Sequence, residues 1–127
     1  MSGKVVHFEI PYDDGDRARA FYGDTFGWEL VQIPDMGYTM VTTGPTDPEK
    51  GATEPGFING GMFERNAEFP GKAPNIVIDV PSIDEALRKV DAAGGTVVRE
   101  RTQVGEMGFT AYFTDTEGNL VGLWENA

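Results

Sequence analysis

The sequence contains no cysteine and no long apolar run. The absence of cysteine among its 127 residues excludes disulfide bonds, thiolate nucleophiles and thiolate metal ligands. No segment reaches the roughly 18 consecutive apolar residues of a membrane-spanning helix, so we expect no membrane association. The first residues, MSGKVVHFEIP, carry neither a long apolar segment nor a small-residue cleavage site. We therefore expect no signal peptide and a cytoplasmic location.

Positive charge is scarce. Ten Lys and Arg residues stand against 21 Asp and Glu residues, which gives a formal net charge of -11. Nucleic acid and anionic membrane surfaces would be repelled, so neither is an expected partner. A neutral or cationic small molecule would not be repelled and is the expected partner. The alternative is that the acidity serves only solubility.

Strand and helix signals alternate along the chain, and their order repeats once. Lys4–Ile10 predicts a strand, residues 13–27 predict a helix, and three further strands follow. Residues 75–80 predict another first strand, and the clearest helix, at 82–95, opens with capping-box spacing between Ser82 and Glu85. Three more strands follow. We expect one domain over residues 1–127, with a first module at about 4–64, a linker at 65–74 and a second module at about 75–126.

The spacing of matching residues supports a duplication. Asn75 follows His7 by 75 − 7 = 68 positions, and Met107 follows Met36 by 107 − 36 = 71 in the similar phrases MGYT and MGFT. In the final strands Gly122 follows Gly60 by 122 − 60 = 62. The repeat therefore predicts that His7 superposes on Asn75 and Gly60 on Gly122. Neither half is large enough to bury its own sheet face, so the two must pair.

Two passages, HFEIPYDDGDRARAFYGDTFGWEL and FTDTEGNLVGLWE, resemble the vicinal oxygen chelate superfamily, which includes glyoxalase I, bleomycin-resistance proteins and extradiol dioxygenases. The resemblance extends from about Val5 to Glu125. It implies an α+β fold in which two tandem strand-helix-strand-strand-strand modules form a curled mixed sheet, shaped as a cup for a small molecule. Markers of a fold are weaker markers of an activity.

The resemblance also locates the positions of metal ligands. Metal-using members take one ligand from the first and last strand of each half, usually His, Gln or Glu, to hold a divalent ion. Here these positions are His7, Asn75, Gly60 and Gly122, of which only His7 is a sound ligand. Glu125 lies on the opposite face of its strand by alternation. We therefore expect no metal cofactor, and a divalent metal bound through His7 is the alternative.

Alternation along the four strands of the expected cup gives the candidate ligand-binding residues. They are His7, Glu9, Gly60, Met62, Asn75, Asp79, Gly122 and Trp124. His7 and Glu9 are the catalytic candidates if the protein is an enzyme. The plainer interpretations remain open: His7 as a hydrogen-bonded core residue, Trp124 as core packing, and the glycines as positions of close strand packing.

The function that these features favour is small-molecule binding in the manner of bleomycin-resistance proteins, without a catalytic metal. The alternative is a divergent lyase, isomerase or dioxygenase-like enzyme that uses His7 with or without a divalent metal. A ligand sensor is a third option. The resemblance further implies a homodimer, and the sequence does not name the ligand.

Overall fold

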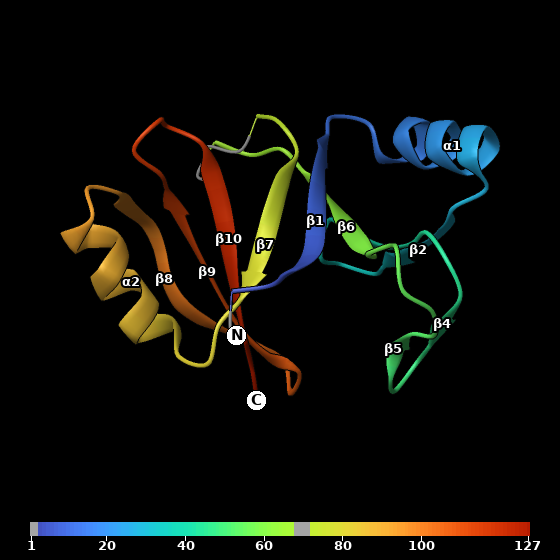
Figure 1. Ribbon diagram of the computed structural model, residues 1–127. Coiled ribbons are helices and arrows are strands. Elements are labelled where there is room, and N and C mark those ends of the chain that lie inside the picture. Colours follow the sequence, from blue (N-terminus) through green and yellow to red (C-terminus); the bar gives the residue numbers. More distant parts are fainter. Residues whose placement is uncertain (1–2, 68–71) are drawn as a thin grey trace. The chain divides into compact units, whose positions relative to one another are not determined.

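The computed structural model describes residues 3–67 and 72–127, and they form two successive strand-helix-strand-strand-strand modules (Figure 1). The first module consists of β1 (Val5–Tyr12), α1 (Gly15–Phe26), β2 (Glu29–Ile33), β3 (Tyr38–Thr42) and β6 (Gly60–Glu64). The second consists of β7 (Asn75–Asp79), α2 (Ile83–Ala92), β8 (Thr96–Val104), β9 (Gly108–Thr114) and β10 (Leu120–Asn126). The predicted α+β fold of two tandem modules is confirmed.

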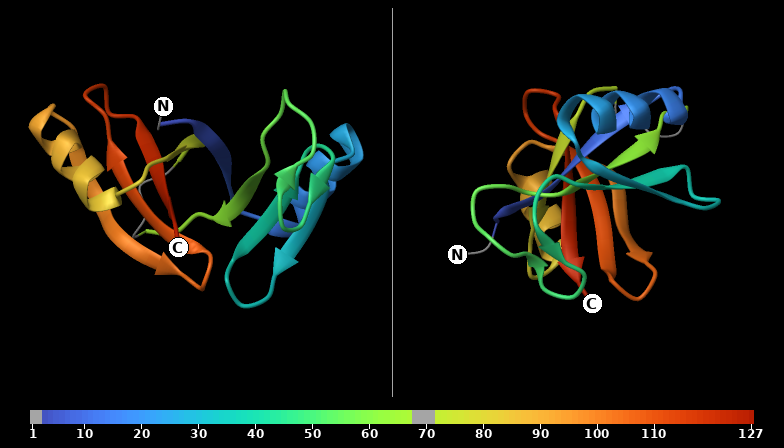
Figure 2. Two further views of the ribbon diagram at one scale, coloured as in Figure 1. Left: turned by 60° about the horizontal axis from the view of Figure 1, so that its bottom comes forward. Right: turned by 90° about the vertical axis from the view of Figure 1, so that its right-hand side faces the viewer.

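The long loop between β3 and β6 contains structure that the sequence did not predict. Two short strands, β4 (Thr46–Asp47) and β5 (Gly51–Ala52), pair antiparallel within it. Figure 2 shows this hairpin in green, along the connection from β3 to β6. The predicted linker at 65–74 lies partly outside the described residues. None of the helices in the described ranges is long and apolar enough to cross a membrane.

The chain divides into two compact units. Unit A runs from His7 to Pro74, and its sheet has the strand order β2-β3-β6-β1. Unit B comprises residues 75–127 with the residues before His7, and its sheet has the order β7-β10-β9-β8. In each sheet the module's first and last strands pair in parallel, β1 with β6 and β7 with β10, while the other pairs are antiparallel.

Both helices begin at a side-chain cap. The Asp14 carboxylate accepts a hydrogen bond from the Arg17 amide at 3.1 Å, and the Ser82 hydroxyl accepts one from the Glu85 amide at 3.2 Å. Each cap satisfies an amide that the first turn leaves without a helical partner. Helix α1 ends at Gly27, whose φ of 71° is the left-handed conformation that glycine adopts at low cost.

Helix α2 packs on one face of its sheet through a small apolar core. Ile83 and Leu87 are buried against Ala111 of β9 and Leu123 of β10. Glu125 lies on this same face, because its carboxylate accepts a hydrogen bond from the Ile83 amide at 2.8 Å. The strand alternation predicted this placement of Glu125 away from the candidate residues. We call the side that the helix covers the helix face of each sheet and the opposite side its far face.

The helix face of unit A is built from the even-numbered residues of β1. Tyr12 is buried with Val41 and Met62, and Phe8 and Ile10 pack against them. Aromatic rings from α1 and from Trp28, the residue before β2, add to this side, and Tyr22 stacks on Trp28 at 5.0 Å between ring centroids. The odd-numbered His7 and Glu9 therefore lie on the far face, as predicted.

The expected orientation of β6 is wrong by one residue. Met62 is completely buried in the core on the helix face. A side chain at Gly60 would collide with Phe8, which lies on the same side. The far face of β6 is formed by Gly61 and Phe63 instead, because successive residues of a strand point to opposite faces. Gly60 and Met62 are thus excluded from the surface that carries His7 and Glu9.

The repeat is real, but two of the predicted equivalences shift by one position. Glu9 pairs with Gly61 in unit A and Val77 pairs with Gly122 in unit B, so Gly61 and not Gly60 is the equivalent of Gly122. The similar segments MGYT and MGFT are also not structurally equivalent residue by residue. Tyr38 lies on the far face, while Phe109 packs with the core on the helix face. The offset of 75 − 7 = 68 between His7 and Asn75 agrees with the faces of β1 and β7.

Candidate functional site

The far face of unit A carries a cluster of three polar side chains. His7 and Glu9 project from β1, and Tyr38 reaches them from β3 across the intervening strand β6. The Tyr38 hydroxyl lies 3.0 Å from Nε2 of His7 and is also hydrogen-bonded to the Glu9 side chain. Glu9 is buried. The sequence predicts that His7 and Glu9 lie together, but it does not indicate Tyr38.

Burial and the Glu9 charge shift the protonation equilibria of the cluster. Burial lowers the pKa of His7 below its ordinary value of 6.5, and the nearby Glu9 carboxylate partly opposes this shift. The pKa of Tyr38 is raised, first by burial and then by the charge and hydrogen bond of Glu9. At neutral pH the His7 imidazole is therefore neutral and the Tyr38 phenol is protonated.

Gly61 makes the cluster possible. A Cβ atom at position 61 would overlap the Tyr38 hydroxyl and ring, so only glycine lets the ring lie across β6 toward β1. Gly61 is also the equivalent of Gly122, one of the two last-strand positions that the family resemblance assigned to a metal ligand, whereas Gly60, the other, faces the core. In unit A the place equivalent to Gly122 is covered by the phenol of Tyr38.

The side chains present do not fit a resident divalent metal. Within residues 3–67 and 72–127 no three His, Cys, Asp or Glu side chains are grouped to hold a metal ion. In unit A, Nε2 of His7 is engaged by Tyr38, and Glu9 is the one carboxylate of the cluster. The expectation of a metal-free site stays a prediction.

Apolar side chains share the far face of unit A with the cluster, on strands β2, β3 and β6. Strand pairing places Val31 of β2 opposite Met40 of β3, and these residues are 53% and 41% exposed. Ile33 pairs with Tyr38, and Tyr38 pairs with Phe63 of β6. The arrangement combines apolar side chains with one small polar cluster, the composition that small-molecule sites commonly have.

In unit B the remaining candidates lie on the far face of the sheet. Asn75 and Asp79 project from β7, and Gly122 and Trp124 from β10. A Cβ atom at Gly122 would lie 3.1 Å from the Tyr112 ring, so this glycine too is covered by a tyrosine from the adjacent strand. The far faces of both units thus share the combination of a glycine and an overlying tyrosine.

Trp124 is held in a defined orientation. Its indole Nε1 donates a hydrogen bond to Oδ1 of Asn126 at 2.9 Å. Its ring covers Gly108, where an added Cβ would lie 2.7 Å from a ring atom. Asn75 is buried at 6% exposure, and its Nδ2 donates to the Ile76 carbonyl at 3.3 Å. The orientation of Trp124 suits both core packing and a stacking surface, so its role stays a prediction.

Two residues that sequence reasoning missed, Tyr38 and Gly61, complete the site in unit A. A signal for Gly61 existed, since Met62 fits a buried position better than a ligand surface and its assignment to the core fixes the orientation of β6. Tyr38 gave no signal of its own. Its contact with His7 joins residues 31 positions apart on strands that are not adjacent.

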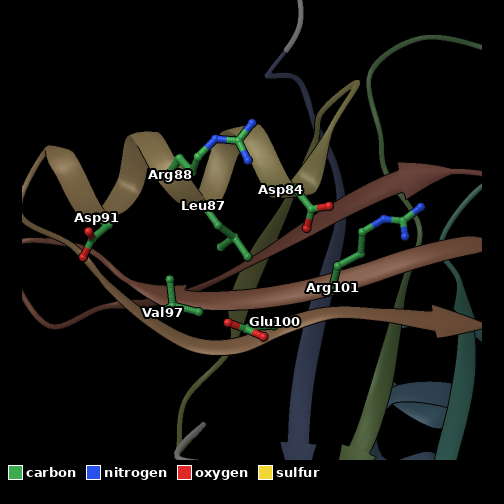
Figure 3. Close-up of a pocket in the computed structure, with 7 residues that line it drawn as sticks. All are labelled: Asp84, Leu87, Arg88, Asp91, Val97, Glu100 and Arg101. Carbon is green, nitrogen blue, oxygen red and sulfur yellow. The ribbon is translucent and has the colours of Figure 1, made fainter.

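A separate pocket lies in unit B between α2 and β8, on the helix face and therefore opposite the far-face candidates of that unit. Its volume is about 420 Å³. Figure 3 shows Leu87 and Val97 pointing toward each other across it, with Asp84 and Arg101 toward one end and Asp91 toward the other. Arg101 is already engaged, because its guanidinium lies 3.5 Å from the Phe109 ring centroid and pairs with Glu125 at 2.9 Å. This pocket is a groove of mixed charge beside the helix.

Comparisons with known proteins agree with the fold. A family model described as bleomycin resistance protein-like N-terminal matches residues 4–44. A glyoxylase-like domain-containing protein from Didymella fabae is 31% identical over 122 residues, which cover 94% of this chain and 91% of that protein.

Solved structures are similar over almost the whole chain. Methylmalonyl-CoA epimerase from Mycobacterium tuberculosis has a TM-score of 0.64 at 20% identity, covering 98% of this chain and 88% of that chain. A glyoxalase/bleomycin resistance protein/dioxygenase superfamily member from Vibrio splendidus 12B01 has a TM-score of 0.63 at 17% identity, covering 98% and 100%. At these identities the structural similarity concerns the fold alone.

Proposed function

Because the chain belongs to the vicinal oxygen chelate superfamily of glyoxalase, bleomycin-resistance and dioxygenase proteins, we propose that it is a small-molecule binding protein that works without a catalytic metal. The observation that carries this proposal is the position of Tyr38 over Gly61. It fills the place of a metal ligand and engages the only histidine of the chain.

The chemistry of the far faces favours a flat or apolar ligand with a neutral or positively charged group. In unit A, Val31 and Met40 offer exposed apolar surface on the sheet face that also carries the buried Glu9 side chain, on strands β2 and β3. In unit B, Trp124 offers a ring for stacking or cation–π contact, worth roughly 0.5–2 kcal/mol. A small anion would meet unfavourable charge in a chain of net charge -11.

A thermal-shift screen of cationic aromatic compounds against small carboxylates tests the proposal. We expect the cationic aromatics to raise the melting temperature of the wild type and to do so less in a Trp124→Ala variant. Stabilisation by carboxylates alone, unchanged in the Trp124 variant, would contradict the proposed ligand class. Native mass spectrometry of the purified protein would show directly whether a small molecule co-purifies.

One observation favours an enzyme as the second candidate. The neutral imidazole of His7 is oriented by Tyr38, which is oriented in turn by Glu9, and such a chain is a common arrangement for a general base. An enzyme of this kind would be lyase- or isomerase-like. Turnover of a candidate ligand that is lost in a His7→Ala variant that still binds it would establish catalysis.

We include a homodimer in the proposal. The outer surface of α1 supports it, since Phe21 and Phe26 are 57% and 60% exposed and α1 has no buried residue in the chain taken alone. Large aromatic side chains exposed together are typical of association surfaces. Light scattering of the purified protein should give twice the chain mass, and a Phe21→Ser, Phe26→Ser variant should shift it toward the monomer.

A further inference from the structure

We propose that Tyr38 is a positioning residue that holds His7 as the Nε2–H tautomer, so that Nδ1 of His7 is a hydrogen-bond acceptor selecting ligands that carry an N–H or O–H donor. The inference rests on the proposed binding function for its ligand class. Its first test uses the protein without any ligand, so the tautomer assignment and the proposed binding function can fail separately.

The direction of the hydrogen bonds follows from the count of protons in the cluster. The Tyr38 hydroxyl has one proton to donate and lone pairs to accept with, and it contacts both Glu9 and His7. A carboxylate can only accept, and a hydrogen bond to an anion is stronger than one to a neutral imidazole nitrogen. The hydroxyl proton therefore goes to Glu9. The oxygen of Tyr38 is left to accept, and Nε2 of His7 must carry the proton that it donates.

This assignment determines the chemistry of the other ring nitrogen. A neutral imidazole has a single N–H, so an Nε2–H tautomer leaves Nδ1 with a free lone pair. Within the described part of the chain, the one hydrogen bond of the His7 side chain runs through Nε2. The burial that keeps His7 neutral also keeps Nδ1 an acceptor at neutral pH.

Gly61 contributes by fixing where Tyr38 can lie. Because position 61 has no side chain, the Tyr38 ring lies directly on the β6 backbone and its hydroxyl reaches the neighbouring strand. Buried Glu9, the cross-strand partner of Gly61, then orients that hydroxyl. The cluster is thereby preorganised, and a ligand would not need to order it on binding.

The ligand class follows from the acceptor and its surroundings. A ligand on this face would place a donor against Nδ1 of His7 and an apolar body against the surface that includes Val31 and Met40. Amines, phenols and indole-type rings have such a donor, while ethers and N-alkylated rings of the same shape lack it. A buried acceptor left without a donor costs about 1–3 kcal/mol, so discrimination between such pairs should be strong.

The sole histidine makes the tautomer measurable without assignment, because only one imidazole contributes to a ¹⁵N-histidine spectrum. In the wild type at pH 8 we expect Nε2 in the protonated, pyrrole-type range, Nδ1 in the pyridine-type range, and an Nε2 proton that exchanges slowly with water. In Tyr38→Phe the slow proton should disappear and the two nitrogen shifts should move toward the averaged values of a tautomer mixture. Tyr22→Phe removes a hydroxyl from the helix face of the same unit and should leave the spectrum unchanged.

Two outcomes overturn the tautomer assignment. A wild-type proton on Nδ1 would mean that Tyr38 donates to His7, and the selected ligand would then need an acceptor. A Tyr38→Phe spectrum identical to the wild type would mean that Tyr38 does not determine the tautomer. Because the wild-type measurement uses the unaltered protein, the assignment remains testable if Tyr38→Phe fails to fold.

Indole and 1-methylindole test the ligand class, since 1-methylindole replaces the N–H donor of indole with an N–methyl group. Indole should shift the Nδ1 resonance of the wild type, and 1-methylindole at equal concentration should shift it at least tenfold less. Equal shifts, or no shift with indole up to its solubility, overturn the donor requirement. If both compounds stabilise the protein equally, the binding function survives and this inference fails. If the tautomer is as expected but the screen finds no ligand, the binding function fails.

Discussion

Gly61 lies directly beneath the hydroxyl of Tyr38, so a single hydrogen atom is the largest side chain that position 61 can have while the ring stays in place. Gly61→Ala should therefore displace Tyr38, expose His7 to water and destabilise the fold by about 1–3 kcal/mol. Urea denaturation measures the loss. Gly23→Ala is the matched control, because its added methyl would meet Leu30 at an ordinary contact distance of 3.6 Å. Alanine inside helix α1 should leave stability unchanged or raise it by about 0.5–1 kcal/mol. Equal effects of the two substitutions would contradict the steric argument.

Leu87 anchors α2 to its sheet. Leu87→Ala should lower the free energy of unfolding by about 2–4 kcal/mol, since the lost methyl groups leave a cavity beside Ala111 and Leu123. Met107→Ala, at a residue that is 62% exposed, should change it by less than about 0.5 kcal/mol. A small effect at Leu87 would show that α2 contributes little to the stability of unit B.

Glu125 should make stability depend on pH in the acid range. Hydrogen bonds from Arg101 and then from the Ile83 amide hold the pKa of this carboxyl below its usual value of 4.5. The unfolded chain consequently binds the proton more readily, so the contribution of Glu125 is fully present above pH 4.5 and is lost as pH falls through the folded-state pKa. Glu125→Gln should flatten this part of the stability profile.

The control for Glu125 is Glu85→Gln, which removes a carboxylate whose contact with Lys89 is long, at 3.9 Å, and exposed. Chemical denaturation from pH 3 to pH 7 should show the acid-induced loss unchanged in this variant. If Glu125→Gln keeps the same slope as the wild type, the bonds to Glu125 are not maintained in solution.

Metal retention is predicted to be low. Protein incubated separately with zinc, nickel, iron and manganese and then desalted should keep well under one equivalent by elemental analysis, because one imidazole engaged by Tyr38 is a poor basis for a site. The measurement needs no substrate. Stoichiometric metal that is lost in His7→Ala would show that Tyr38 gives way to the ion.

The sequence predicted the fold more fully than the site, for a physical reason. Repeat spacing and the capping-box spacing at Ser82 depend on local signals, and they correctly gave the order of strands and helices. The direction of each side chain on β6 depends on the register of a single residue. Two adjacent glycines, Gly60 and Gly61, carry no apolar or polar preference that could fix that register.

The similar segments that begin at Met36 and Met107 gave a second wrong equivalence, again by one residue of register. Four residues separate β2 from β3, but only three separate β8 from β9. The residues that match in sequence therefore occupy different positions in β3 and β9. Tyr38 consequently faces His7, while Phe109 lies under Arg101 on the helix face. Tyr38 could not be found from sequence because its partners are on a strand that is not adjacent to its own.

The hydrogen bond from Ile83 to Glu125 also constrains the order of folding. It joins the first turn of α2 to a residue 42 positions later, so this turn lacks one of its native acceptors until β10 has been synthesised. Ser82 alone can start the helix, but its native anchoring must wait for the end of the module. On the ribosome, α2 would emerge as a partly formed amphipathic helix whose apolar side, with Ile83 and Leu87, stays accessible to chaperones until the last strand closes the sheet.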